Sequence, residues 1–155
     1  MTKTFEEQWR EKNQIRVVFD TFDGQKCNHL VHLTPDDVDK ILYIGIMYGI
    51  KGWCSKVDIL GDKMLGTYVS DQVSRGGYIL VYDKFCKGVS TIGLKSFLEA
   101  YCEIYAMSVR FNMSEHCNDG YFYSSPRVCD YIIQYAVFGG IKYPHTETEC
   151  EEYEY

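Results

Sequence analysis

Hydrophobic and polar positions in the first third of the chain predict a helix and then a hairpin. Residues 4–12 are mostly polar, and Phe5 and Trp9 stand four positions apart, which predicts a short helix clipped to the body on one side. The runs 14–22 and 27–33 are rich in β-branched and aromatic residues and flank Asp23-Gly24. An Asp-Gly pair between two such runs is typical of a β-hairpin, because the turn requires positive φ.

A central helix is predicted next, beginning at Thr34-Pro35-Asp36-Asp37 and running to about Tyr48. Thr34 is a good N-cap, Pro35 suits the first helical position, and the two aspartates favour the positive end of the helix dipole. Apolar residues occur on every side of this segment. That pattern is typical of a helix central in the fold or at an oligomer interface. We favour the central position, and a homodimer stays open.

The second half of the chain predicts two strands and three helices. The strands are 55–60 and 78–82, with a short helix over 67–75 between them that stops at Gly76-Gly77. A later helix begins near Leu94, and the last one begins at Ser125-Pro126 and ends at Gly139-Gly140. Apart from that short helix, the order of the elements is roughly αββαββαα, which lacks regular βαβ alternation. We therefore predict a single α+β domain over residues 1–144, with a mainly antiparallel sheet of about four strands packed with three or more helices.

Composition and charge narrow the class of protein. The chain has 155 residues, 46% of them hydrophobic, which suits one soluble globular domain. The net charge is −6, but five glutamates lie in residues 145–155, and without them the body has 17 acidic and 16 basic residues. We expect that segment to be a flexible acidic tail. A basic footprint for nucleic acid is lacking. No membrane span or export signal is apparent in the pattern, so we expect a cytoplasmic protein.

Three ordered motifs carry a resemblance to a known family. They are Gly49-Ile50-Lys51-Gly52-Trp53-Cys54, the segment 70–77 (SDQVSRGG) and the segment 130–139 (DYIIQYAVFG). In these motifs the chain resembles a family of small acidic proteins found in gut Firmicutes, their phages and their mobile elements. The similarity runs from about Leu33 to Tyr143 and departs most between Phe85 and Ser125. It implies a bacterial or phage cytoplasm and an accessory role, and it brings no catalytic residue.

Metal and thiol chemistry are weakly supported. Cys27, His29 and His32 lie close in sequence, but in a strand His32 points away from the other two. His116-Cys117 also lacks zinc-knuckle spacing, so we predict no metal site and no cofactor. Seven cysteines without a Cys-x-x-Cys pattern indicate reduced thiols. Cys54, beside Trp53, is the cysteine we single out as a candidate nucleophile, and the simpler interpretation is a small buried residue. The common hydrolase, NTPase and zincin motifs are absent.

Two segments are candidate binding sites. Ser70, Asp71, Ser74, Arg75, Gly76 and Gly77 offer hydroxyls, a guanidinium and accessible amides for a phosphorylated or nucleotide ligand, and the simpler interpretation is a helix stop. Tyrosine is abundant, and aromatic rings are enriched at protein interfaces. The candidate protein interface combines an aromatic cluster with the acidic tail: Tyr121, Phe122, Tyr123, Glu147, Glu149, Glu151, Glu152, Tyr153, Glu154 and Tyr155.

The leading hypothesis is a non-enzymatic phage or mobile-element accessory protein. It would bind and inhibit a host protein with a basic groove, a defence nuclease for example, in the manner of an anti-CRISPR. The alternative is a small-molecule binder that sequesters a phosphorylated or nucleotide ligand at residues 70–77.

Overall fold

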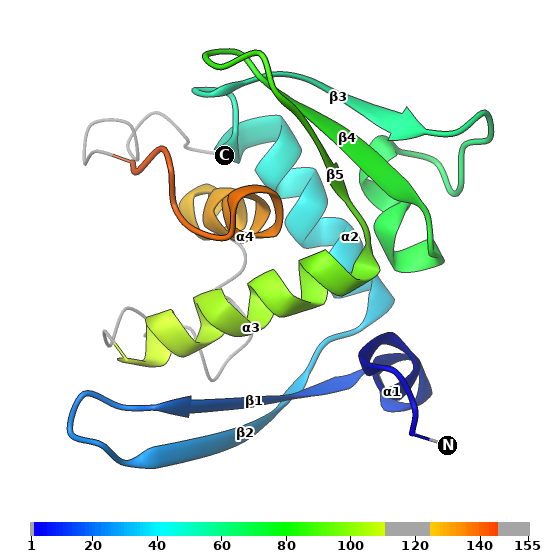
Figure 1. The fold of residues 1–155 in the computed structure, drawn as a ribbon. Coiled ribbons are helices and arrows are strands. Elements are labelled where there is room, and N and C mark those ends of the chain that lie inside the picture. Colours follow the sequence, from blue (N-terminus) through cyan, green and yellow to red (C-terminus); the bar gives the residue numbers. More distant parts are fainter. Residues whose placement is uncertain (1, 111–124, 146–155) are drawn as a thin grey trace.

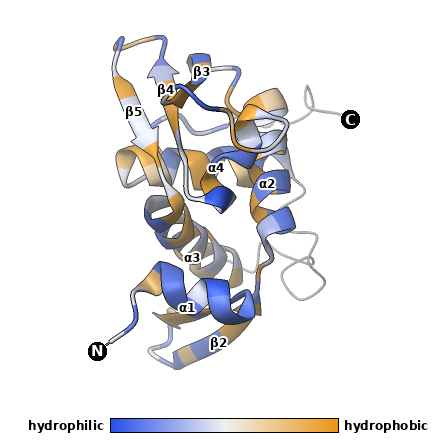
Figure 2. Cartoon of the chain, turned by 90° about the vertical axis from the view of Figure 1, so that its right-hand side faces the viewer, coloured by the Kyte–Doolittle hydropathy of each residue, from blue (hydrophilic) through white to orange (hydrophobic). Residues whose placement is uncertain are grey.

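The first 33 residues form the predicted helix and hairpin. In the computed structural model, which describes residues 2–110 and 125–145, α1 (Phe5–Lys12) begins at Thr4, and the Thr4 hydroxyl accepts the Glu7 amide. The strands β1 (Gln14–Asp20) and β2 (Lys26–His32) pair antiparallel, and Gly24 in their turn has a φ of 84°. Figure 2 shows α1 largely hydrophilic, as its sequence predicts. Both elements are confirmed.

The predicted central helix changes its winding near its end. α2 (Pro35–Ile44) begins at the Thr34 cap and continues as a π-helical turn (Gly45–Gly49). The turn lies against α4 (Pro126–Phe138), where a Cβ on Gly49 would come within 2.6 Å of the Pro126 carbonyl oxygen. Only glycine allows this approach. The prediction of a helix to about Tyr48 is therefore right for the path of the chain and wrong for its α-helical geometry beyond Ile44.

The second sheet contains β3 (Cys54–Leu60), β4 (Tyr78–Asp83) and β5 (Val89–Ile92), antiparallel and in that order. Between β3 and β4, two 3₁₀ turns (Val69–Asp71 and Val73–Arg75) replace the single short helix that we expected. They end at Gly76, which has a φ of 88°. The α+β class and the antiparallel pairing are confirmed.

The strands form two sheets rather than the one that we expected. Among the described residues, β1 and β2 pair only with each other. The helices α3 (Leu94–Arg110) and α4 lie between this hairpin and the three-stranded sheet (Figure 1). β5 has only four residues between Gly88 and Gly93, too short a run for the sequence pattern to show.

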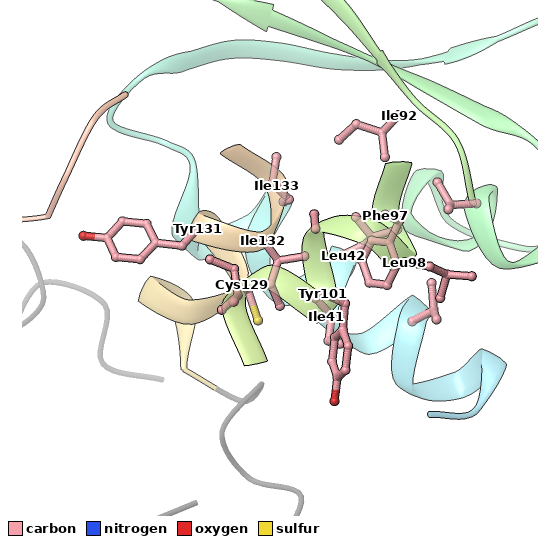
Figure 3. Close-up of a cluster of buried hydrophobic side chains, with 14 of the residues drawn as sticks. Ile41, Leu42, Ile92, Phe97, Leu98, Tyr101, Cys129, Tyr131, Ile132 and Ile133 are labelled. Carbon is pink, nitrogen blue, oxygen red and sulfur yellow. The ribbon is translucent and has the colours of Figure 1, made fainter. Parts of the chain in front are cut away.

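The core lies where α2, α3 and α4 meet beneath the three-stranded sheet. Figure 3 shows its side chains, among them Ile41 and Leu42 of α2, Phe97 and Tyr101 of α3, and Ile132 of α4. All five are at most 1% exposed. The central position of α2 is therefore confirmed.

Candidate protein-binding groove

The helix α3 separates an apolar face from a charged one. Phe97, Leu98 and Tyr101 are buried, whereas Glu99 and Glu103, one turn apart, are exposed on the opposite side. A helical period of 3.6 residues produces this separation. The apolar face holds α3 rigidly against the core, so the two carboxylates project from a fixed support.

The two glutamates line a cavity of about 640 Å³ between α3 and α4. Tyr135 and Gly139 of α4 lie on its other side. A second cavity, of about 490 Å³, continues from Ser96 and Glu99, which line both, toward Arg10 of α1. We call the α3–α4 part, lined by Glu99, Glu103 and Tyr135, the acidic groove.

The electrostatics of the acidic groove are dominated by carboxylates. Burial, together with the negative charges of Glu103 and Glu99, raises the pKa of the nearby Cys102 thiol to about 12. Neither Glu99 nor Glu103 forms an ion pair within residues 2–110 and 125–145. The groove therefore presents two carboxylates that form no ion pair within the described part of the protein.

The residues predicted to bind a phosphate are engaged within the fold. Arg75 Nη1 donates to Asp39 Oδ2 at 3.1 Å and to the Asp71 carbonyl at 2.9 Å, and the Ser74 hydroxyl donates to Asp39 Oδ1 at 2.5 Å. Asp71 Oδ2 accepts the amides of Thr67 and Tyr68, each at 2.9 Å. Asp39 thus engages Arg75 Nη1 and the Ser74 hydroxyl, and these bonds connect the 3₁₀ turns to α2.

The other members of that segment have separate environments. Ser70 is buried with 3% exposure. Gly76 has positive φ and lines the 490 Å³ cavity beside Arg10, and Gly77 packs closely on the Gln72 backbone. This geometry is that of the helix stop that we considered as the simpler interpretation.

The predicted aromatic and acidic interface lies outside the described residues. This holds for Tyr121, Phe122 and Tyr123, for the tail residues Glu147, Glu149, Glu151, Glu152, Tyr153, Glu154 and Tyr155, and for His116 and Cys117. His145, the first residue of the predicted tail 145–155, is the last residue that the structure describes.

The candidates for metal and thiol chemistry have ordinary environments. Cys27 and His29 share the inner face of the hairpin and His32 points outward, as predicted, while His29 Nδ1 lies 2.9 Å from the Tyr105 hydroxyl. No three potential ligands gather within the described part of the chain. Burial raises the pKa of the Cys54 thiol, which is the opposite of what activates a nucleophile.

The three motifs that carry the family resemblance form hydrogen bonds within the fold. Trp53 Nε1 donates to Asp130 Oδ1 at 2.7 Å, which joins the first motif to the third. In the second motif the Gln72 side chain forms hydrogen bonds with both the backbone amide and the carbonyl of Leu65.

Comparisons with protein-family models, curated proteins and solved structures give no match for this chain. None of the described helices is long and apolar enough to cross a membrane.

Sequence analysis missed Glu99, Glu103 and Tyr135 as functional candidates. A signal was present, because assigning Phe97, Leu98 and Tyr101 to the apolar face of a helix places Glu99 and Glu103 on the other face. What the pattern lacked was the second wall of the groove, which depends on how α4 packs against α3.

Proposed function

We propose that this chain is a non-enzymatic accessory protein of a phage or mobile element that binds and inhibits a host protein in the bacterial cytoplasm. The acidic groove is the described part of the contact surface, and the partner is a protein with a basic surface, such as a defence nuclease. The phage or mobile-element setting rests on the resemblance of the three motifs. The mode of binding rests on the groove.

The observation that carries the proposal is the pair of exposed carboxylates on α3. Glu99 and Glu103 have no ion-pair partner among the described residues, and they face a cavity that Tyr135 helps to line. Arginine side chains bind carboxylates through two parallel hydrogen bonds, and tyrosine supplies contact area at low entropic cost. A basic segment of a partner protein therefore matches this surface in charge and chemistry.

The distribution of charge supports a protein partner rather than nucleic acid. The groove repels phosphate groups, and the tail adds five glutamates directly after the described residues. Charge of one sign accelerates association with an oppositely charged partner and makes the rate sensitive to salt.

The test is a tagged pull-down from nuclease-treated host lysate, followed by native mass spectrometry and by titration of the identified protein. The test variant is Glu99→Gln/Glu103→Gln. The control, Glu11→Gln/Asp62→Asn, removes the same number of charges from exposed positions on α1 and after β3. We expect the groove variant to bind the partner at least about tenfold more weakly, with a slower association rate, and the control to stay within about twofold of wild type.

Two results would overturn the proposal. One is a partner that the groove variant binds as tightly as the wild-type chain does. The other is a wild-type chain that captures no stoichiometric protein from the lysate of a host that carries the element.

A further inference from the structure

A further concave site is formed by the segments before β3, after β4 and after α4. It is a pocket of about 310 Å³ with aromatic, basic and glycine residues around it. Its lining comprises two glycines, three aromatic rings, a lysine, a proline and a histidine: Gly49, Gly52, Trp53, Phe85, Lys142, Tyr143, Pro144 and His145. We call it the aromatic pocket. Its volume is at the lower end of the range for small-molecule sites.

The walls of the aromatic pocket are rings packed against one another. Trp53 and Tyr143 stack with centroids 5.7 Å apart and an interplanar angle of 17°. Phe85 lies 5.5 Å from Tyr143, yet it is 63% exposed. The Lys84 ammonium lies over one face of the Phe85 ring, 5.4 Å from its centroid, so another flat ring can pack on the other face.

Buried carboxylates keep these rings in position. Asp130 is fully buried and accepts hydrogen bonds from Trp53 Nε1, from Gln134 Nε2 and from His145 Nε2. Asp83 accepts the Tyr143 hydroxyl at 2.7 Å and the Phe85 amide at 2.8 Å. The pocket is thus preorganised, which lowers the entropic cost of binding.

The ionisation of Asp83 follows from the same contacts. Burial opposes its charge, but the hydrogen bonds from Tyr143, from the Cys86 side chain and from the Phe85 and Cys86 amides outweigh burial and hold its pKa well below the usual range. The carboxylate is therefore charged at neutral pH and is already provided with donors.

The accessible charge at the pocket is positive. Lys142 lines it with a side chain that is 43% exposed, and its ammonium lies 3.4 Å from Asp83 Oδ2. The Lys84 ammonium lies 3.4 Å from the carbonyl of Lys51, which directly precedes the lining residue Gly52. Asp83 and Asp130, by contrast, are buried and hydrogen-bonded. An incoming anion therefore meets lysines rather than carboxylates.

We propose that the aromatic pocket binds a small anion with a flat ring, of the nucleoside monophosphate class. The base packs against Phe85 and Tyr143, and the phosphate contacts the ammonium groups of Lys142 and Lys84. This site is separate from the acidic groove, and it takes a ligand of the opposite charge. It also differs from residues 70–77, where Arg75 Nη1 and the Ser74 hydroxyl contact Asp39.

The test is isothermal titration of the full chain with AMP, adenosine and inorganic phosphate, checked by the fluorescence of Trp53 and Trp9. The variants are Lys142→Ala and Phe85→Ala, and both side chains are exposed enough for the fold to persist. The matched controls are Lys26→Ala and Phe22→Ala on the hairpin, where Phe22 is 72% exposed. Circular dichroism shows that each variant is folded.

We expect saturable AMP binding with one site per chain, and at least about tenfold weaker binding of adenosine. Lys142→Ala should weaken AMP binding and leave adenosine binding unchanged, with Lys84 still contacting the phosphate. Phe85→Ala should weaken both ligands about tenfold or more, while the controls stay within about twofold. The proposal is overturned if wild type shows no saturable binding of AMP at millimolar concentration. It is equally overturned if AMP and adenosine bind alike, or if the two pocket variants bind as wild type does.

Discussion

The acidic groove and the aromatic pocket share no lining residue, and they use charge in opposite ways. In the groove, Glu99 and Glu103 stand on the outside of a helix without an ion pair among the described residues. In the pocket, Asp130 and Asp83 are buried and bonded to the rings that form the walls. The charges of the groove are exposed and do not take part in the packing of the fold, whereas the charges of the pocket are buried in it and bonded to its side chains.

Because of this difference, the residues expected to bind a partner in the groove are not the residues that stabilise the fold. Exposed charges on a helix contribute little to folding, so they can change with the partner. Buried carboxylates that satisfy several donors cannot be removed without leaving those donors unpaired. Substitutions around the pocket should therefore lower the free energy of unfolding strongly, and substitutions in the groove should change it little.

Asp130→Ala should have the largest effect, lowering the free energy of unfolding by about 3–5 kcal/mol. It leaves Trp53 Nε1 without its acceptor in a fully buried place. Urea denaturation at pH 7 measures the loss, with the exposed Asp62→Ala as control. A loss below about 1 kcal/mol would mean that the pocket does not depend on this carboxylate.

Asp83→Asn should cost about 2 kcal/mol at pH 7, since hydrogen bonds to a charged group contribute more than neutral ones. Because the folded-state pKa of Asp83 lies below the unfolded value, its carboxylate stabilises the fold above about pH 4, and that contribution disappears as the pH falls further. Urea denaturation at pH 7, 5, 4 and 3 should show the two proteins converging at the acid end. A difference that stays constant with pH would contradict this assignment.

Arg75→Ala should cost about 0.5–1 kcal/mol, because its ion pair with Asp39 is half-exposed. The second readout is the change in melting temperature with added phosphate, which should be equal in wild type and variant. If phosphate stabilised only the wild type, Arg75 would bind anions despite its contact with Asp39, and residues 70–77 would again be a ligand site.

Glu99→Gln/Glu103→Gln should change the free energy of unfolding by less than about 0.5 kcal/mol. Urea denaturation of this variant gives the baseline for the partner titration described above. A large loss of stability would instead place the two glutamates in the support of α3 and remove the contrast between groove and pocket.

Local structure followed from the sequence wherever a few neighbouring residues decide it. Thr34 and Pro35 specify the start of α2, and Asp23-Gly24 specifies the hairpin. The π-helical turn was not foreseeable, because it depends on Gly45 and Gly49 meeting α4, more than 75 residues later in the chain. The separation into two sheets likewise depends on where α3 inserts.

The candidate sites followed from the sequence only in part. The donors of residues 70–77 were correctly identified as donors, but their partner, Asp39, lies in α2. The motif residues Trp53 and Asp130 were singled out by resemblance, and only the structure brings them together at 2.7 Å. Neither surface is contiguous in sequence, so spacing alone could not define it.

The placement of α3 against the hairpin also affects how the chain is made. The inner face of the hairpin, with Ile15, Val17 and Phe19, is covered by a helix that follows much later, and the contact between His29 and Tyr105 spans 76 residues. At a synthesis rate of roughly 5–20 residues per second, those apolar side chains wait roughly 4–15 s for their cover. During that interval the apolar face of the hairpin lacks its cover, and such an open two-stranded sheet is prone to pair with other chains.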